Sequence, residues 1–551
     1  MFSGTVFWAA AAVCALDAPR VAGSPYPTAA IPDSLYLIAD EGLPESQRLI
    51  AQTLQGSARG ASAIWRVRAG GYALWLEELR REPGLSVVSD FRNDLPGLLK
   101  RFRPQLRGYV LCDLHAPSAN AALSLCGVLR TAAGGVIAAT ADQAALLDGL
   151  GLPMLADARG HDEAWALAAH PEAFSRNVLV LQDRAKDLFL GDYSVFAGAL
   201  HFQAPLGSPL LDAALGRMRG QAVMLGWGDD EFKLVERASR ASVQVHAADW
   251  AVNLSALTRF GKQARQPPPV PPAARVGVHT VCFLMSDGDN LQWLLGGFAA
   301  PGGKWFGNAA RGTVSAGWTV SPALAELAPH ALARLYAASA TAPAARDRFV
   351  AGPSGSGYMF PEAFADLDSA AALTARCMAK ADLRILNLLG NDTADRYLEP
   401  FLRRDGIDAV FYYPFSDYSG LKGSIRFVSG KPVIGGYANL WEGFETPASL
   451  AARLNARPKD PKSKGGYSLI PVHAWSRTMA DLAACANALG PDVRVVAPDE
   501  FVRAIAENLG PPMATGPKAL SKGAGPGDRG RFHADGRRAR ARNSPAPAWK
   551  R

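Results

Sequence analysis

The chain has 551 residues, of which 49% are hydrophobic and 20% are charged. That composition is typical of globular proteins, and it excludes a wholly disordered chain and a coiled coil. At about 150 residues per domain, the length predicts three or four compact units. The net charge of +8 belongs to residues 511–551, which hold ten Lys or Arg and two Asp or Glu, so that 48 basic and 48 acidic residues remain elsewhere. The globular part is therefore neutral, and we expect no nucleic-acid partner.

The two ends of the chain differ from the part between them. Residues 1–23 contain an alanine-rich apolar run followed by small residues, although the basic start of a secretory signal is missing. This pattern predicts a signal peptide and a secreted or periplasmic protein, with an apolar cap on the first domain as the alternative. Residues 511–551 are rich in Gly, Pro, Ala and Arg, which predicts a disordered basic tail. No internal run approaches the roughly 20 apolar residues of a membrane-spanning helix, so we expect no membrane span.

Residues 28–265 alternate short apolar runs with helical stretches. The strand-like runs are Ser34–Ala39, Tyr109–Cys112, Gly135–Ala139, Asn177–Leu181 and Ala222–Trp227. Such alternation predicts βαβ units with parallel sheets, and the length of the region suits two or three small α/β subdomains. No GxGxxG sequence follows the first run, so nothing supports a dinucleotide site.

A polyproline linker at residues 266–272 separates this region from residues 273–510. In the second region the pattern predicts eight strands, with helices in most of the gaps between them. The predicted strands are Val276–Met285, Thr313–Val320, Phe349–Gly352, Arg384–Leu389, Ala409–Tyr413, Pro432–Gly435, Tyr467–Val472 and Val493–Ala497. Eight strands in about 240 residues match a (β/α)8 barrel, that is, a TIM-barrel-like domain, or a close variant. A doubly wound open sheet is the alternative, because both folds share this periodicity.

Polar and aromatic side chains follow most of these strands, where the active site of a barrel lies. Aromatic rings can stack on sugars while carboxylates and amides bind hydroxyl groups, so this composition indicates a carbohydrate cleft. The candidate substrate-binding residues at these positions are Asn290, Trp318, Gly355, Gly357, Tyr358, Asn391, Asp392, Trp441, His473 and Trp475. Asp392 can instead cap the helix that follows it.

The segment Ser286–Asn290, with the sequence SDGDN, ends the first strand of the second region. Asp287 and Asp289 are two residues apart, so an extended backbone places both carboxyls on one side, where they can act as acid and base or share a metal. A magnesium phosphatase of the Asp-x-Asp type is one alternative. The other is a turn that caps the next helix, since Asp and Asn favour such turns.

The segment Gly355–Pro361, GSGYMFP, combines two glycines with a proline. Together with SDGDN and the two-part layout, it resembles the signature of the GxGYxYP putative glycoside hydrolase family, over about residues 30–510. The resemblance implies small N-terminal α/β subdomains, a barrel-like C-terminal domain and cleavage of glycosidic bonds. Phe360 stands where the signature has its second Tyr, so one hydroxyl is missing while ring stacking is kept.

We therefore predict a glycoside hydrolase that acts on an oligosaccharide or polysaccharide through Asp287 or Asp289, with Glu442 as the second carboxylate. Glu442 follows a predicted strand and lies beside Trp441, which would favour a raised pKa. Trp318, Tyr358, Trp441 and Trp475 are the predicted sugar platforms, and no cofactor is expected. Two alternatives stay open: a metal-dependent deacetylase or phosphoesterase that uses Asp287, Asp289 and His473, and a glycan-binding protein without catalysis.

Overall fold

The computed structural model of the chain describes residues 23–132, 134–269, 276–340 and 347–511. The predicted signal peptide, except for its last residue, and the predicted tail from residue 512 onwards lie outside the described residues, as do residues 270–272 of the linker. Among the described helices, none is both long and apolar enough to cross a membrane. The five described cysteines are all buried and free.

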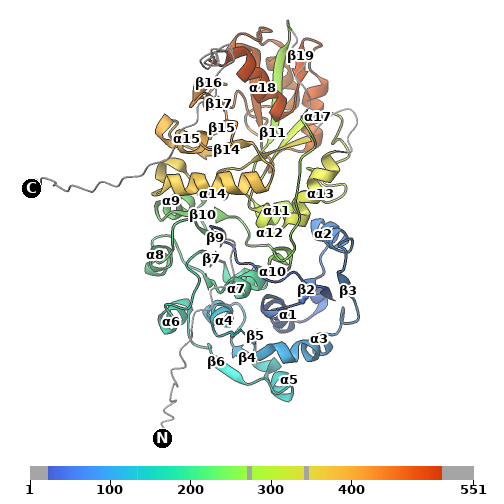
Figure 1. Cartoon of the computed structure of the whole chain (residues 1–551), viewed down its shortest axis with the longest axis vertical. Helices are drawn as coiled ribbons and strands as arrows, with labels where there is room; N and C mark the ends of the chain where they lie inside the picture. Colours follow the sequence, from blue (N-terminus) through green and yellow to red (C-terminus); the bar gives the residue numbers. More distant parts are fainter. Residues whose placement is uncertain (1–22, 133, 270–275, 341–346, 512–551) are drawn as a thin grey trace, which may run out of the picture. The chain divides into compact units, whose positions relative to one another are not determined.

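Three parallel sheets precede the linker, coloured blue to green in Figure 1. The first, ordered β2-β1-β3, comprises β1 (Ser34–Ile38), α1 (Glu45–Ser57), β2 (Ser62–Arg66), α2 (Gly71–Leu79), β3 (Ser86–Val88) and α3 (Leu95–Phe102). The second, ordered β5-β4-β6, comprises β4 (Leu106–Leu111), α4 (Pro117–Val128), β5 (Gly135–Ala139), α5 (Ala144–Gly149), β6 (Met154–Asp157) and α6 (Glu163–Ala169). The third, ordered β10-β9-β7-β8, comprises β7 (Val178–Leu181), α7 (Gly191–Ala197), β8 (Leu200–Phe202), α8 (Pro209–Gly216), β9 (Ala222–Gly226), α9 (Glu231–Arg240), β10 (Val243–His246) and α10 (Leu254–Leu257).

The second region forms one nine-stranded sheet, coloured yellow to red in Figure 1. Its strands are β11 (His279–Met285), β12 (Ala316–Val320), β13 (Asp347–Ala351), β14 (Ile385–Gly390), β15 (Ala409–Pro414), β16 (Ile425–Val428), β17 (Lys431–Gly435), β18 (Tyr467–Val472) and β19 (Val493–Val495). The helices are α11 (Leu291–Leu295), α12 (Leu324–Leu327), α13 (Pro329–Ser339), α14 (Leu367–Lys380), α15 (Asp395–Leu402), α16 (Pro447–Asn455), α17 (Met479–Asn487) and α18 (Pro498–Leu509). All eight predicted strands are present, most of them almost continuously apolar because helices cover a parallel sheet.

The sheet curls into a barrel-like arrangement. Strands β12 to β15 and β17 follow β11 in chain order on one side, and β18 pairs with β11 on the other. Beyond β17, the amides of Tyr437 and Leu440 donate to the carbonyls of Leu469 and Pro471 at 2.8 and 2.9 Å, so that the two ends of the sheet meet. The predicted α/β fold with a barrel-like second domain is therefore confirmed.

The last strand departs from a regular (β/α)8 barrel. A regular barrel would insert β19 between β18 and β11. Here Thr280 and Val281 of β11 pair with both strands, so β19 lies on the opposite side of β11 from β18. Strand β12 pairs with β11 only at Leu284 and Met285, which leaves room for β19 beside the start of β11. The domain is thus a close variant of the barrel.

A buried core joins the first and third subdomains to the barrel. A single cluster of buried apolar side chains includes Trp65 of the first sheet, Tyr193 of the third subdomain and Phe283 of the barrel. A buried ion pair adds to it, since Arg66 Nε lies 2.7 Å from Asp40 and both side chains are fully buried. Burial raises the pKa of Asp40, but the charges and hydrogen bonds of Arg66 and Arg68 outweigh it and hold the pKa at about 2.

The Asp40→Asn variant is expected to lower the melting temperature markedly at pH 7. Removing one partner of a buried pair leaves the other charge uncompensated, which costs about 3–5 kcal/mol. Because the pKa of Asp40 is depressed, the stabilisation is present above about pH 4 and is lost as the pH falls towards 2. Melting curves at pH 7 and pH 3 measure this. Glu41→Gln, which alters an exposed partner of Arg68, is the control and should melt like the native chain.

Candidate active site

The SDGDN segment forms a tight turn directly after β11. Asp287 adopts a left-handed conformation with φ of 70°, and Gly288 packs against β12 so closely that a Cβ would lie 2.1 Å from the carbonyl carbon of Thr319. The amide of Gly288 donates to Thr319 Oγ1 at 2.9 Å, and Asn290 Oδ1 accepts from the amide of Trp293 at the start of α11. Strand β12 and helix α11 thus hold the turn between them.

This turn forms one wall of a small pocket of about 50 Å³, here called the carboxylate pocket. Asp289 is only 7% exposed and Asp287 is half-buried, which differs from the exposed carboxylates that a strand end predicts. A third carboxyl, that of Glu231, comes from the first turn of α9 in the third subdomain. The lining consists of Trp227, Glu231, Ala247, Asp287, Asp289, Asn290, Pro353, Tyr358, Leu389, Tyr418 and Trp475.

The three carboxyls influence one another. Burial raises the pKa of Asp289 well above its ordinary value, and the charges of Asp287 and Glu231 add to this. Burial also raises the pKa of Asp287, to about 6, although a hydrogen bond from Ser286 opposes the shift. Glu231 is an exposed residue as a whole, but burial of its carboxyl raises its pKa against a hydrogen bond from Tyr358. Burial and two neighbouring charges thus favour the protonated form of Asp289, whereas the hydrogen bond from Ser286 favours the ionised form of Asp287.

The GSGYMFP segment joins the third subdomain to the barrel. Tyr358 and Val245 of β10 exchange two backbone hydrogen bonds of 2.7 and 2.9 Å. The amide of Gly357 donates to Gln244 Oε1 at 2.7 Å, and a Cβ at this glycine would lie 2.9 Å from the ring of His246. The hydroxyl of Tyr358 donates to Glu231 Oε1 at 2.8 Å. The segment therefore brings Glu231 to the turn after β11.

Two aromatic residues of this region behave differently from the prediction. Tyr358 is only 2% exposed, so its hydroxyl faces Glu231 while its ring offers little surface for a sugar. Phe360 packs between Phe232 and Phe415, with ring centroids 5.1 and 5.5 Å away. A second tyrosine hydroxyl at position 360 would lie among these rings.

Of the four predicted sugar platforms, Trp475 agrees best with the prediction, whereas the prediction for Trp318 is wrong. Trp475 is 49% exposed and lines the carboxylate pocket, braced by the edges of Trp293 and Trp305. Trp318 is fully buried and donates from Nε1 to Asp347 at 2.8 Å, so it belongs to the core. A strand side chain that points outward toward the helices is buried there, and residue order alone does not reveal which way it points.

Several other predicted residues lie outside the carboxylate pocket. Glu442 is exposed on the loop after β17, where its amide donates to Ser476 Oγ. His473 stacks on Trp441 at 3.9 Å between ring centroids, its Nδ1 lies 2.9 Å from Ser476 Oγ, and burial lowers its pKa to about 4. The pocket lining also omits Gly355, Gly357, Asn391 and Asp392.

Asp392 accepts from the amide of Ala394 at 2.8 Å, just before α15 begins. Asp392 therefore forms a turn before the helix, but it does not cap the helix as the alternative predicted, because the N-cap of α15 is Ala394 and has no side-chain cap. The proposed metal set of Asp287, Asp289 and His473 does not line one pocket. Within the described residues, no three His, Cys, Asp or Glu side chains are grouped so that they could hold a metal ion.

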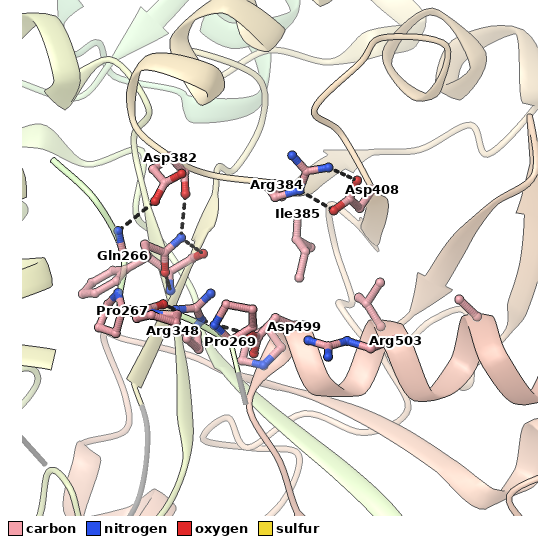
Figure 2. A pocket seen from close by; sticks show the side chains of 15 residues that line it. Gln266, Pro267, Pro269, Arg348, Asp382, Arg384, Ile385, Asp408, Asp499 and Arg503 are labelled. Atoms are coloured by element: carbon pink, nitrogen blue, oxygen red, sulfur yellow. Dashed lines mark hydrogen bonds and ion pairs between the residues drawn. The ribbon is translucent and has the colours of Figure 1, made fainter. Parts of the chain in front are cut away.

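A larger pocket of about 420 Å³ lies at the opposite end of the barrel, where β13, β14 and β15 begin (Figure 2). Four of its charged groups pair with one another: Arg384 pairs with Asp408 at 2.6 Å, and Arg348 lies 3.1 Å from Asp499. Gln266 of the linker donates its amide to Asp382 at 2.9 Å. This end of a barrel supports stability, whereas chemistry takes place at the carboxyl ends of the strands. The smaller carboxylate pocket is therefore the candidate active site.

Three residues with polar or aromatic side chains line the carboxylate pocket but were not predicted as site residues: Trp227, Glu231 and Tyr418. The segment Gly228-Asp229-Asp230-Glu231 does follow a predicted strand, and three successive acids were a signal that could have been noted. Nothing in the sequence, however, indicates that α9 begins beside the barrel. Tyr418 follows β15 and is 7% exposed, with its ring stacked on Tyr413.

The chain resembles known proteins over most of its length. Residues 277–506 match the GxGYxYP putative glycoside hydrolase C-terminal domain, residues 176–259 the GxGYxYP third domain and residues 106–173 the GxGYxYP_N second domain. A crystal structure described as a putative hydrolase from Bacteroides thetaiotaomicron VPI-5482 is 28% identical and superimposes with a TM-score of 0.80. The match covers 88% of this chain and 97% of that one. No curated protein sequence matches the chain significantly.

Proposed function

Because the chain belongs to the GxGYxYP putative glycoside hydrolase family, we propose that it hydrolyses glycosidic bonds in the carboxylate pocket. One observation carries this proposal: Asp287, Asp289 and Glu231 line a single pocket at the carboxyl end of β11. Glycosidases need one carboxyl that is protonated and one that is ionised at the same pH. The different environments of Asp287 and Asp289 meet that need.

Asp289 is the general acid in this proposal. Burial and the charges of Asp287 and Glu231 raise its pKa and so favour the protonated carboxyl, and in that form Asp289 can protonate the leaving oxygen as the bond breaks. Asp287 has a pKa of about 6 and is mostly ionised at pH 7. Its negative charge stabilises the oxocarbenium-like transition state, and water that adds to the anomeric carbon completes the hydrolysis and returns a proton to the carboxyl pair. The hydrogen bond from Ser286 favours this ionised form.

Glu231 and Tyr358 set the conditions for these two acids. The charge of Glu231 raises the pKa of both Asp287 and Asp289, and the hydroxyl of Tyr358 holds the Glu231 carboxyl in place. The half-exposed ring of Trp475 lies at the same pocket and offers a surface for the apolar face of a sugar. The third subdomain and the barrel thus both contribute to the proposed site.

Hydrolysis assays test this function. The native chain and the Asp289→Asn variant are incubated with starch, cellulose, xylan, chitin, pectin and mucin, and released reducing ends are quantified. Turnover of at least one glycan by the native chain alone is expected, and it should survive a chelator, since the roles above need no metal ion. Loss of turnover with EDTA, restored by a divalent cation, would favour the metal-dependent alternative. Glycan binding without any turnover would favour the non-catalytic one.

The pH dependence of kcat/KM is expected to rise through about pH 6 rather than near pH 4. The rise reports ionisation of Asp287, whose pKa is about 6. Removing the Ser286 hydroxyl takes away a hydrogen bond that favours the ionised form, so Ser286→Ala should move the rise to higher pH. Profiles between pH 4 and pH 9 measure both effects. A rise near pH 4 in the native chain, or no displacement in Ser286→Ala, would contradict the role of Asp287.

A further inference from the structure

A second pocket, of about 210 Å³, lies beside the carboxylate pocket on the third subdomain. We call it the switch-point pocket, and it is lined by Leu181, Gln182, Asp183, Arg184, Gln203, Ala204, Pro205, Trp227, Gly228 and Asp229. Trp227 lines both pockets. The turn between β9 and α9 therefore forms their common wall, with Trp227 to Asp229 on one side and Glu231 on the other.

The topology of the third sheet explains this position. In the order β10-β9-β7-β8, the chain passes from β7 to β8 on one side and then returns to β9 on the other. The topological switch point thus lies between β7 and β9. Open α/β sheets bind ligands in the crevice at this point, outside the carboxyl ends of the strands. Residues 182–184 follow β7 and residues 227–229 follow β9, so they form the two sides of that crevice.

A close backbone approach fixes Trp227 at the boundary. Gly226 has a φ of 117°, and a Cβ there would lie 1.7 Å from the carbonyl oxygen of Leu181, so only glycine fits. The amide of Trp227 donates to the same carbonyl at 3.1 Å. These contacts tie the end of β9 to the end of β7 and hold the indole between the two pockets.

The wall of the switch-point pocket carries an unused acceptor. Gln182 is fully buried, and its Nε2 donates to the carbonyls of Lys186 and Asp249 at 2.8 and 2.9 Å. These bonds fix the amide orientation. Its Oε1 is buried and has no hydrogen-bond partner among the described residues. Buried polar atoms are normally satisfied, and this one lies behind the pocket wall, out of contact with solvent.

The charges favour a neutral ligand. Arg184 is paired with the buried Glu163 at 3.0 Å, so its positive charge is already compensated. Asp183 and Asp229 are exposed carboxylates on the same wall. A phosphate, a sulfate or an acidic sugar would meet these negative charges. Hydroxyl groups can donate to carboxylates and amides, and the Trp227 ring offers an apolar face, which together suit a neutral sugar.

The sizes of the two pockets indicate how long the substrate must be. The carboxylate pocket, at about 50 Å³, is far below the roughly 300 Å³ at which small-molecule sites usually begin. A substrate that reaches Asp287 and Asp289 must therefore extend beyond that pocket, and the switch-point pocket is its neighbour, since Trp227 lines both. We propose that the switch-point pocket is a subsite for one sugar unit of a neutral oligosaccharide whose neighbouring unit enters the carboxylate pocket. This inference rests on the proposed function and adds the part of the substrate that the third subdomain binds.

Calorimetric titration of the Asp289→Asn variant tests the subsite without turnover. The probes are maltohexaose, cellohexaose, xylohexaose and chitohexaose, each compared with its disaccharide, and hexagalacturonate as the acidic comparison. At least one neutral hexasaccharide is expected to bind about tenfold more tightly than its disaccharide, since a filled subsite adds about 1.4 kcal/mol. Asp229→Ala and Gln203→Ala should each remove most of that advantage. Asp90→Ala, an exposed carboxylate of the first subdomain, should keep it.

Four results would overturn the subsite. They are equal affinity for each hexasaccharide and its disaccharide, no binding of any neutral hexasaccharide at millimolar concentration, tighter binding of hexagalacturonate than of every neutral probe, and unchanged binding in both Asp229→Ala and Gln203→Ala. Melting curves of the two variants verify that they fold. Length-dependent binding together with no turnover by the native chain would reject the proposed function and keep the subsite. Turnover without length dependence would reject the subsite alone.

Discussion

The Asp289→Asn variant is expected to lose at least about a hundredfold in kcat, because an amide of the same size cannot deliver the proton to the leaving oxygen. Its melting temperature at pH 7 should equal or exceed that of the native chain. The pKa of Asp289 is raised in the folded state, so ionisation favours the unfolded chain once the pH exceeds about 4. Asparagine removes that cost. The stability difference should therefore shrink as the pH falls towards 4.

Measurements of kcat on the cleaved glycan, with calorimetric melting curves at pH 7 and pH 4, test both parts of this prediction. Asp287→Asn should show a comparable loss of kcat, since the ionised partner is then missing. Near-normal turnover in Asp289→Asn would show that Asp289 is not the general acid. A much lower melting temperature would instead make Asp289 a structural residue of the turn after β11.

Glu231→Gln is expected to lower kcat about tenfold or more and to move the acidic side of the pH profile to lower pH. Glutamine still accepts the hydrogen bond from Tyr358, so the joint between α9 and the barrel is kept. The variant removes the negative charge that raises the pKa of Asp287. Asp287 should then ionise at lower pH, which a merely structural role of Glu231 would not produce.

The profile of kcat/KM against pH, recorded for the native chain and Glu231→Gln, measures this displacement. Glu236→Gln is the control, because it removes the same charge from the same helix at a residue that pairs with Arg240. Its profile should match that of the native chain. If Glu442 were the second carboxylate, the loss would appear in Glu442→Gln and be absent from Glu231→Gln, and our assignment would be wrong.

Local pattern was enough to predict the second region of the chain. Its strands are buried by helices, so they appear in the sequence as short, nearly unbroken apolar runs separated by amphipathic helices. All eight predicted strands are present, and SDGDN ends β11 as expected. Strands β2, β3, β6, β8 and β10, and β16 in the second region, were not predicted, because most of them have only three or four residues and are too short for a periodic pattern.

The position of β19 could not be predicted either. Chain order suggests that the last strand pairs between β18 and β11, but it pairs on the other side of β11. Nothing in the short run Val493–Val495 indicates its partner. The partner of a strand depends on how the whole sheet curls, and the sequence pattern of a single strand does not indicate that curvature.

The sequence by itself determined the class of fold, the two acids after β11 and the family signature, because each depends on residues that are adjacent in the chain. The tertiary structure decided which side chains share a site. Trp318 is buried in the core, and Glu442 is exposed on a loop. Glu231, from another subdomain, lines the same pocket as Asp287 and Asp289. Asp289 is also buried, and burial is what raises its pKa. Contacts between residues that are far apart in the chain produce the shared site and the burial of Asp289, and no local pattern reveals such contacts.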